Sequence, residues 1–251
     1  MVNVLRICSR GLPFLLNRNP SLPLARSATC LRSFSPSDSF STNSDKPLPP
    51  VSTVLTAPFM SQVKLGSRLV PLLDDSARSS EVSEILNAQL STSDGIRGFF
   101  VSYLTAETPP TAPVNVPKIL KSAMETTSNP VELIDLSIMN VIMPKAQASE
   151  FLRLKGLEDA DYDGPMEGSN NSMMKSSEMT AKRGKAVVEV LMGFEGEVWE
   201  RTRAQFESVR RVAKGEEDGG EEDERWKIFF EKWGYEEHQR SAIAKVSDEI
   251  L

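Results

Sequence analysis

The spacing in this chain that best suits a chemical role is that of three aspartates at alternate positions, which suit metal-ion binding. They are Asp159, Asp161 and Asp163. Alternate carboxylates in a tight loop can turn their oxygens toward one centre, and carboxylate oxygens are ligands that Ca²⁺ prefers. Gly164 follows at the position where such a loop makes its sharp turn. With Glu167 as a fourth oxygen donor, the pattern predicts a calcium site.

The segment from Asp159 to Gly164 resembles the first half of an EF-hand calcium loop, of which it would form positions one to six. Met166 and Glu167 also suit the eighth and ninth positions of that loop. The twelfth position departs from the pattern, because it is Asn170 instead of a bidentate glutamate. This departure favours a solvated acidic loop without a metal, with the calcium site as the alternative interpretation.

His238 is the only histidine of the chain, and it directly follows two glutamates. A histidine beside carboxylates suits acid–base catalysis. A carboxylate-bridged di-iron bundle would need glutamate three residues before the histidine, where this chain has Tyr235. The position near the chain end instead predicts a surface residue. We assign no catalytic residue and, apart from calcium, no cofactor.

The first 34 residues have the composition of an organelle-import presequence. They include five arginines and no acidic residue, among serines, leucines and other small or apolar residues. The run Arg-Ser-Phe-Ser at 32–35 predicts cleavage between Phe34 and Ser35. The predicted destination is the mitochondrial matrix. The chloroplast stroma is the alternative, because residues 33–44 are rich in serine.

Cleavage between Phe34 and Ser35 would change both the reactive groups and the net charge of the remaining chain. It would remove both cysteines, Cys8 and Cys30, and with them any thiol for a disulfide, zinc or an iron–sulfur cluster. It would also remove five of the 29 Lys and Arg and none of the 35 Asp and Glu, so the net charge would change from −6 to −11. Binding to the phosphate backbone of a nucleic acid depends on positive charge, so this acidic protein is not expected to bind nucleic acid. No segment reaches the roughly 20 apolar residues of a membrane-spanning helix, which predicts a soluble protein.

Helix signals recur along the rest of the chain. Residues 35–57, rich in Ser, Thr and Pro, predict a disordered linker, and residues 58–251 predict a single α-helical domain. Apolar residues at helical spacing, with proline before helices and glycine after them, predict an irregular all-α bundle of about seven or eight helices. The nearly continuous apolar run 131–143 predicts a central buried helix, with a buried strand as the alternative.

Further segments indicate which surfaces are buried. An aromatic stripe at helical spacing predicts a core face more strongly than a partner surface. The acidic run 216–224 predicts a solvated loop. Arg183, with Lys182 and Lys185, predicts an exposed basic helix face. The aromatic stripe comprises Trp226, Phe229, Phe230 and Trp233.

These features together favour a protein that binds another protein, as a non-catalytic structural or assembly subunit of an organelle. The helices supply ample apolar surface for such contacts, whereas the chain carries no phosphate-binding glycine loop. One alternative is an enzyme or small-ligand-binding protein that uses carboxylates. A second alternative is a calcium-binding protein that uses the EF-hand-like half loop.

Overall fold

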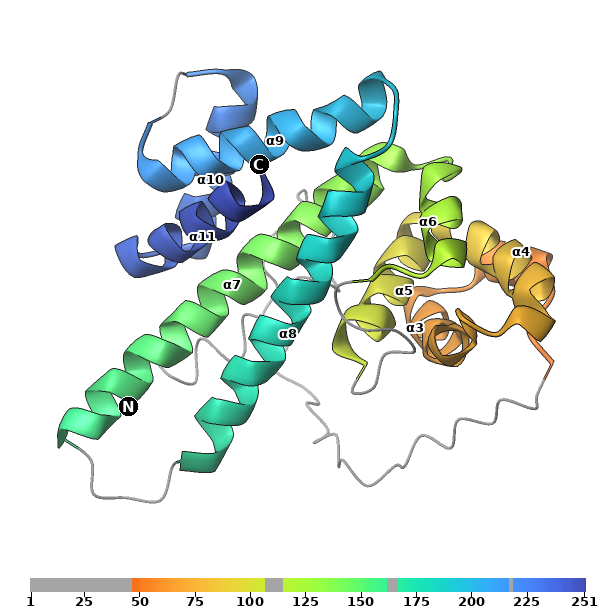
Figure 1. Cartoon of the computed structure of the whole chain (residues 1–251), viewed down its shortest axis with the longest axis horizontal. Helices are drawn as coiled ribbons and strands as arrows, with labels where there is room; N and C mark the ends of the chain where they lie inside the picture. The colour runs from red at the N-terminus through yellow and green to blue at the C-terminus, as the bar shows by residue number, and fades with distance from the viewer. Residues whose placement is uncertain (1–46, 107–114, 162–166, 217–218) are drawn as a thin grey trace, which may run out of the picture. The chain divides into compact units, whose positions relative to one another are not determined.

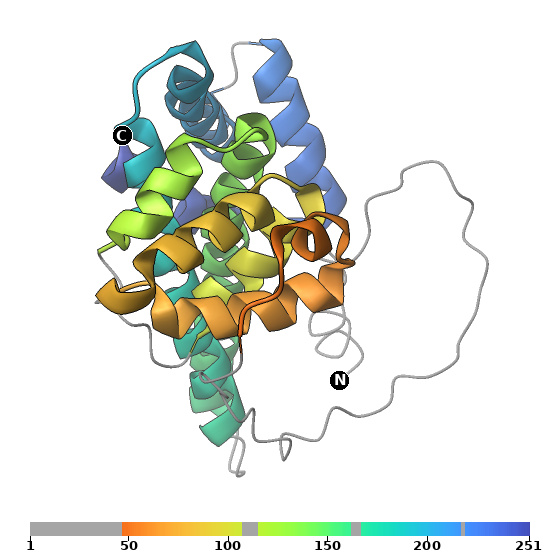
Figure 2. The same cartoon turned by 90° about the vertical axis from the view of Figure 1, so that its right-hand side faces the viewer.

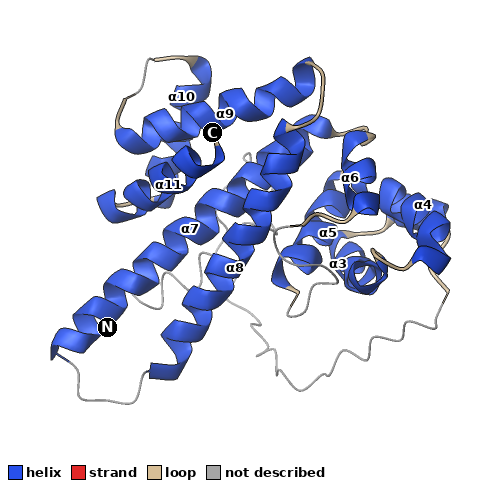
Figure 3. Cartoon of the chain, in the orientation of Figure 1, coloured by secondary structure: helices blue, strands red, loops and turns tan. Residues whose placement is uncertain are grey.

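The computed structural model describes residues 47–106, 115–161, 167–216 and 219–251 (Figure 1). Within these ranges the chain forms ten α-helices and no β-strand, which confirms the predicted all-α fold (Figure 3). In the same ranges, no helix combines the length and apolarity that crossing a membrane requires. The helices are α2 (Val51–Thr56), α3 (Phe59–Leu69), α4 (Ser79–Leu90), α5 (Ser93–Thr105), α6 (Lys118–Glu125), α7 (Pro130–Asp161), α8 (Glu167–Met192), α9 (Glu197–Lys214), α10 (Glu221–Trp233) and α11 (Glu237–Ile250).

Helices α7 and α8 form a long antiparallel hairpin and lie side by side (Figure 1). The apolar run 131–143 lies in α7, where Leu133, Ile138 and Ile142 are fully buried, so the predicted central helix is confirmed. Gly184 of α8 approaches α7 so closely that a Cβ there would lie 2.7 Å from the carbonyl oxygen of Asn140. A larger residue at this position would push the two helices apart.

Pro144 lies inside α7 without ending it. The pattern of residues 130–156 predicts two helices that meet at this proline, and that prediction is wrong. Proline has no N–H, so the usual helical donor to the Asn140 carbonyl, four residues earlier, is missing. Packing of α7 against α8, α9 and α11 holds both halves of the helix in line despite this missing hydrogen bond.

Helices α3 and α5 form a second close pair, among the N-terminal helices that Figure 2 turns toward the viewer. A Cβ on Gly98 of α5 would lie only 2.5 Å from the Cβ of Gln62 and 2.8 Å from the main-chain nitrogen of Val63. On the facing helix, a Cβ on Gly66 would lie 3.1 Å from the Cα of Phe99. Two glycines therefore let these helix backbones approach each other.

Helix α2 lies within the range 35–57 that the composition predicts to be a disordered linker. Val54 of α2 is 1% exposed, and its carbonyl oxygen accepts a hydrogen bond of 2.6 Å from Nε2 of the buried Gln62. Arg68 also donates a hydrogen bond of 2.8 Å to the carbonyl oxygen of Pro47. The folded region therefore begins before residue 58, because contacts distant in sequence hold this segment in place.

Glycines end or separate the C-terminal helices as their positions predict. Gly193 and Gly196 lie inside a stretch of helical apolar spacing and predict a break there. The chain does break at this point, between α8 and α9, and Gly196 has a φ of 112°. Gly234 ends α10 in the left-handed conformation, which glycine adopts without strain. The chain then turns into α11, whose first turn is closed by a capping box between Glu236 and Gln239. This turn sets the entry of α11 onto α7.

Candidate functional site at the junction of α7 and α11

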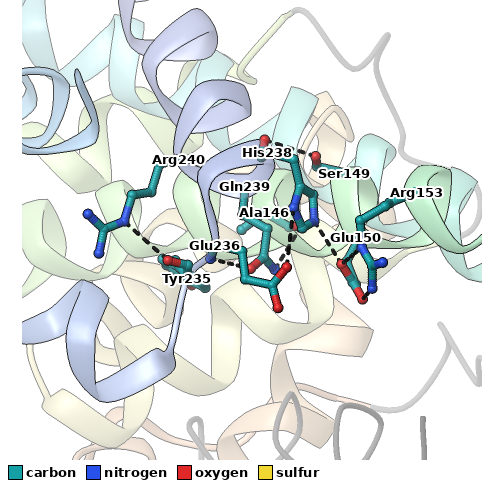
Figure 4. A network of polar contacts seen from close by, with 9 residues as sticks. All are labelled: Ala146, Ser149, Glu150, Arg153, Tyr235, Glu236, His238, Gln239 and Arg240. Carbon is teal, nitrogen blue, oxygen red and sulfur yellow. Dashed lines mark hydrogen bonds and ion pairs between the residues drawn. The ribbon is translucent and has the colours of Figure 1, made fainter. Parts of the chain in front are cut away.

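The single histidine lies between two carboxylates where the start of α11 meets α7 (Figure 4). Its Nε2 is 2.7 Å from Oε2 of Glu150 on α7. Its Nδ1 is 3.7 Å from Oε2 of Glu236, the residue that caps α11. The side chain of His238 is 26% exposed. The predicted surface residue is therefore a half-buried partner in an ion-pair network.

Glu150 is a buried carboxylate held by Arg153 and His238. Arg153, one turn further along α7, donates from Nε to Oε2 at 2.9 Å and from Nη2 to Oε1 at 2.6 Å. These hydrogen bonds from Arg153, together with that of His238, lower the pKa of Glu150 against the opposing effect of burial. The carboxyl group therefore stays ionised at neutral pH.

Two further contacts fix the start of α11 on α7, and a third closes the first turn of α11 (Figure 4). Ser149 donates from Oγ to the carbonyl oxygen of His238 at 3.1 Å. Gln239 donates from Nε2 to the carbonyl oxygen of Ala146 at 3.4 Å. The side-chain oxygen of Gln239 accepts from the Glu236 N–H at 3.0 Å in the capping box. Residues 238 and 239 of α11 are thus bonded to α7 in addition to the contact of the histidine ring.

This geometry suits an electrostatic contact better than acid–base catalysis. Both nitrogens of the His238 ring face carboxylates, so the charged imidazolium can interact with Glu150 and Glu236 together. A catalytic base needs a nitrogen directed at a substrate and a pKa near the working pH. Glu150, with its lowered pKa, is likewise a poor proton donor. We therefore interpret the network as a contact that joins α11 to α7.

A second junction connects α7 with α9 and α10. Asp135 accepts a hydrogen bond of 2.7 Å at Oδ2 from Nη2 of Arg225. Its Oδ1 accepts a hydrogen bond of 3.2 Å from Nε2 of the fully buried Gln205. Arg225 also lies over the ring of Trp226, 5.2 Å from its centroid. One carboxylate on α7 therefore orients side chains from two other helices.

A third junction contradicts the predicted solvated loop at residues 216–224. Helix α10 begins at Glu221, so part of this acidic run forms its first turn, where negative charge is favoured by the helix dipole. Asp223 is 1% exposed and accepts from Arg211 of α9 at 3.0 and 2.7 Å. Ser208 donates a further short hydrogen bond to the same carboxylate. The pairing with Arg211 stabilises the charge of Asp223 in this buried position.

Two other predictions about burial have opposite outcomes. In the aromatic stripe, Trp226 is 2% exposed and Phe230 is fully buried, which confirms a core face. Arg183 is 3% exposed and donates from Nη1 to the carbonyl oxygen of Leu104 at 2.7 Å, so the predicted exposed basic face is wrong at this residue. Burial lowers the pKa of Arg183. Charge alone did not indicate that its helix turns this side chain toward α5.

The predicted calcium ligands and cleavage site fall largely outside what the structure describes. Asp163 and the pair Phe34 and Ser35 are not among the described residues. Asp159 and Asp161 lie in the last turn of α7 and Glu167 begins α8, but only the backbone of these three residues is described. The calcium site and the cleavage site therefore stay predictions.

Calcium binding at this loop would raise the melting temperature of the protein. At about 100 times the dissociation constant, a ligand that binds only the folded state adds about 2.7 kcal/mol to the free energy of unfolding. We expect thermal unfolding to shift upward in Ca²⁺ and the shift to disappear in Asp161→Ala. Asp74→Ala, at an exposed position on another part of the chain, should keep it. An unchanged melting temperature at millimolar Ca²⁺ would contradict the site.

The fold and its junctions define an all-helical protein whose buried carboxylates join helices to one another. Residues 59–250 match the family model described as Uncharacterised conserved protein UCP020893. This match covers most of the chain, from the start of α3 to the end of α11, and the chain therefore belongs to that family. Comparisons with curated proteins and with solved structures gave no match.

Proposed function

We propose that this protein is a non-catalytic structural or assembly subunit that binds another protein inside an organelle. The observation that supports this most strongly is the pairing of its largely buried carboxylates with arginine. Glu150, Asp135 and Asp223 each accept a hydrogen bond of 2.6–2.7 Å from a guanidinium group. The arginine partners of Asp135 and Asp223 come from other helices, so these pairs stabilise the arrangement of helices. The lowered pKa of Glu150 makes its carboxyl group poorly suited to gain and lose protons during catalysis.

The proposed contact surface lies on the α7–α8 hairpin. Leu152 of α7 is 51% exposed and Met179 of α8 is 40% exposed. Exposed large apolar side chains suit contact with another protein, and methionine adapts to irregular apolar partners. The hairpin carries these residues on two long helices that are packed against each other. A partner would thus meet a surface that is already in place.

The proposed location follows from the N-terminal segment. The family match begins at residue 59, so the arginine-rich residues 1–34 precede the region that defines the family. This supports a separate role for that segment as an import signal. The mitochondrial matrix is the destination that we propose, with the chloroplast stroma as the alternative.

Affinity isolation from organelles, with quantification of each co-purifying protein, tests the proposal. The double variant Leu152→Glu/Met179→Glu should lose a specific partner by about tenfold or more, because charges would enter the apolar contact. Ile228→Glu on α10 is the matched control, since Ile228 is 54% exposed and belongs to a helix outside the α7–α8 hairpin. The control variant should co-purify with as much of the partner as the wild-type protein does.

Two results would overturn the proposal. One is equal recovery of every co-purifying protein with the hairpin variant and with the control. The other is turnover of a metabolite by the purified protein that Glu150→Gln abolishes, which would favour the alternative of an enzyme that uses carboxylates. The arginine pairing of Glu150 makes the second result unexpected.

A further inference from the structure

The two ends of α11 are held by charged contacts of different chemical kinds. At its C-terminal end, Asp248 lies 2.8 Å from Nζ of Lys214 and 3.8 Å from Arg210, both on α9. Lys185 of α8 lies 3.2 Å from Glu249. Lysine, arginine and carboxylate side chains keep their charges throughout the neutral range. The contacts at this end include no histidine.

At the N-terminal end, the contact depends on a histidine. Histidine is the side chain whose charge ordinarily changes between about pH 5 and pH 8. Here its ring lies between Glu150 and Glu236, which come from the two elements that must stay together. The other charged group that faces this cluster from α7 is Arg153, which pairs with Glu150 and also interacts with Glu236. On α11, Arg240 is directed to the carbonyl oxygen of Tyr235.

The two carboxylates are held in place independently of the histidine. Glu150 accepts two hydrogen bonds from Arg153, and Glu236 accepts from the main-chain N–H of Gln239 in the capping box. They therefore cannot easily move away when the charge between them changes. Loss of the proton from His238 changes the net charge of His238, Arg153, Glu150 and Glu236 from zero to −1.

The geometry also defines what the neutral ring would do. If Nε2 keeps its hydrogen and donates to Glu150, the lone pair of Nδ1 faces the Glu236 carboxylate at 3.7 Å. An attraction at that position is then replaced by a repulsion. The protonated ring, in contrast, has a positive N–H toward each carboxylate.

We propose that the contact of His238 with Glu150 and Glu236 is a pH-sensitive attachment of α11 to α7, firm when the ring is protonated and weakened when it is neutral. The effect is local, because the C-terminal end of α11 is held by the lysine and arginine contacts. Opening would thus begin at the first turns of α11. Such partial opening of one element is common in folded proteins.

Hydrogen exchange of the intact protein, measured at about pH 6 and about pH 8 and corrected for the intrinsic rates, tests this attachment. We expect amides 239–244 to be about threefold less protected at the higher pH, the size expected for partly exposed ion pairs. The amide of Leu65 in α3 should be equally protected at both values. His238 is the only histidine of the chain, so a single substitution removes all histidine titration.

Two variants separate this proposal from a general effect of pH. His238→Gln keeps a hydrogen-bonding side chain without the titrating charge, and its protection at 239–244 should not differ between the two pH values. Glu236→Gln removes one carboxylate and should reduce the difference while the contact with Glu150 remains. Equal protection of the wild-type protein at both values would overturn the proposal, as would an unchanged difference in His238→Gln.

Discussion

Gly98→Ala should lower the free energy of unfolding by about 2 kcal/mol, within the range found when a packed core receives an extra methyl group. The new Cβ would lie 2.5–2.8 Å from atoms of Gln62 and Val63, two of which belong to the backbone of α3. A backbone cannot rotate away as a flexible side chain can, so α3 and α5 must separate. Chemical denaturation of the purified protein measures the loss.

Gly156→Ala is the matched control for this substitution. Gly156 also lies inside a helix, yet a Cβ there would meet no described atom within 4 Å. Alanine favours the helical conformation over glycine by about 1 kcal/mol, so this variant should be as stable as the wild type or slightly more stable. A loss of stability at position 156 as large as that at 98 would contradict the close packing of α3 on α5.

Removal of residues 1–57 should destabilise the protein by about 3–5 kcal/mol, whereas removal of residues 1–46 should leave it nearly unchanged. The longer truncation deletes Val54, whose burial is worth about 1.5–3 kcal/mol. It also deletes two acceptors of the Gln62 amide, and a buried donor without a partner costs about 1–3 kcal/mol. Comparison of the two truncated proteins by thermal and chemical unfolding measures the difference.

Point substitutions in α2 test the same contact without a change in chain length. Val54→Ala should reduce stability, because Val54 is 1% exposed, whereas Leu55→Ala should have little effect at 45% exposure. If the two substitutions have equal effects, or if both truncated proteins unfold at the same temperature, α2 is not part of the folded unit. The family match, which begins at residue 59, would then mark its true start.

Local signals account for the parts of this fold that were predictable from the sequence. Gly234 after α10 and the glycines near residue 196 act on the backbone at their own positions, so the helix boundaries follow from them. The burial of α7 was likewise predictable from its apolar run, because a helix that is buried on all sides needs a continuous hydrophobic segment. Pro144 gave the wrong boundary, since neighbouring helices hold α7 together at that point.

The candidate site was not predictable in the same way. Glu150 and His238 are 88 residues apart, and neither has a sequence neighbour that indicates the other. Arg153 lies one turn from Glu150, but such spacing is equally common on exposed helix faces. Asp223 was placed in a solvated run because seven of its nine residues are acidic, although the helix start and Arg211 bury this one. Buried charge depends on partners that only the tertiary fold supplies.

The missing hydrogen bond at Pro144 has a consequence for how this family can change during evolution. Pro144 leaves the Asn140 carbonyl without its helical donor, and Gly184 of α8 is the residue that approaches that carbonyl. A residue with an N–H at position 144 could draw the carbonyl back toward the axis of α7 and so make room for a Cβ at 184. The two positions, 40 residues apart, are therefore expected to vary together among members of the family.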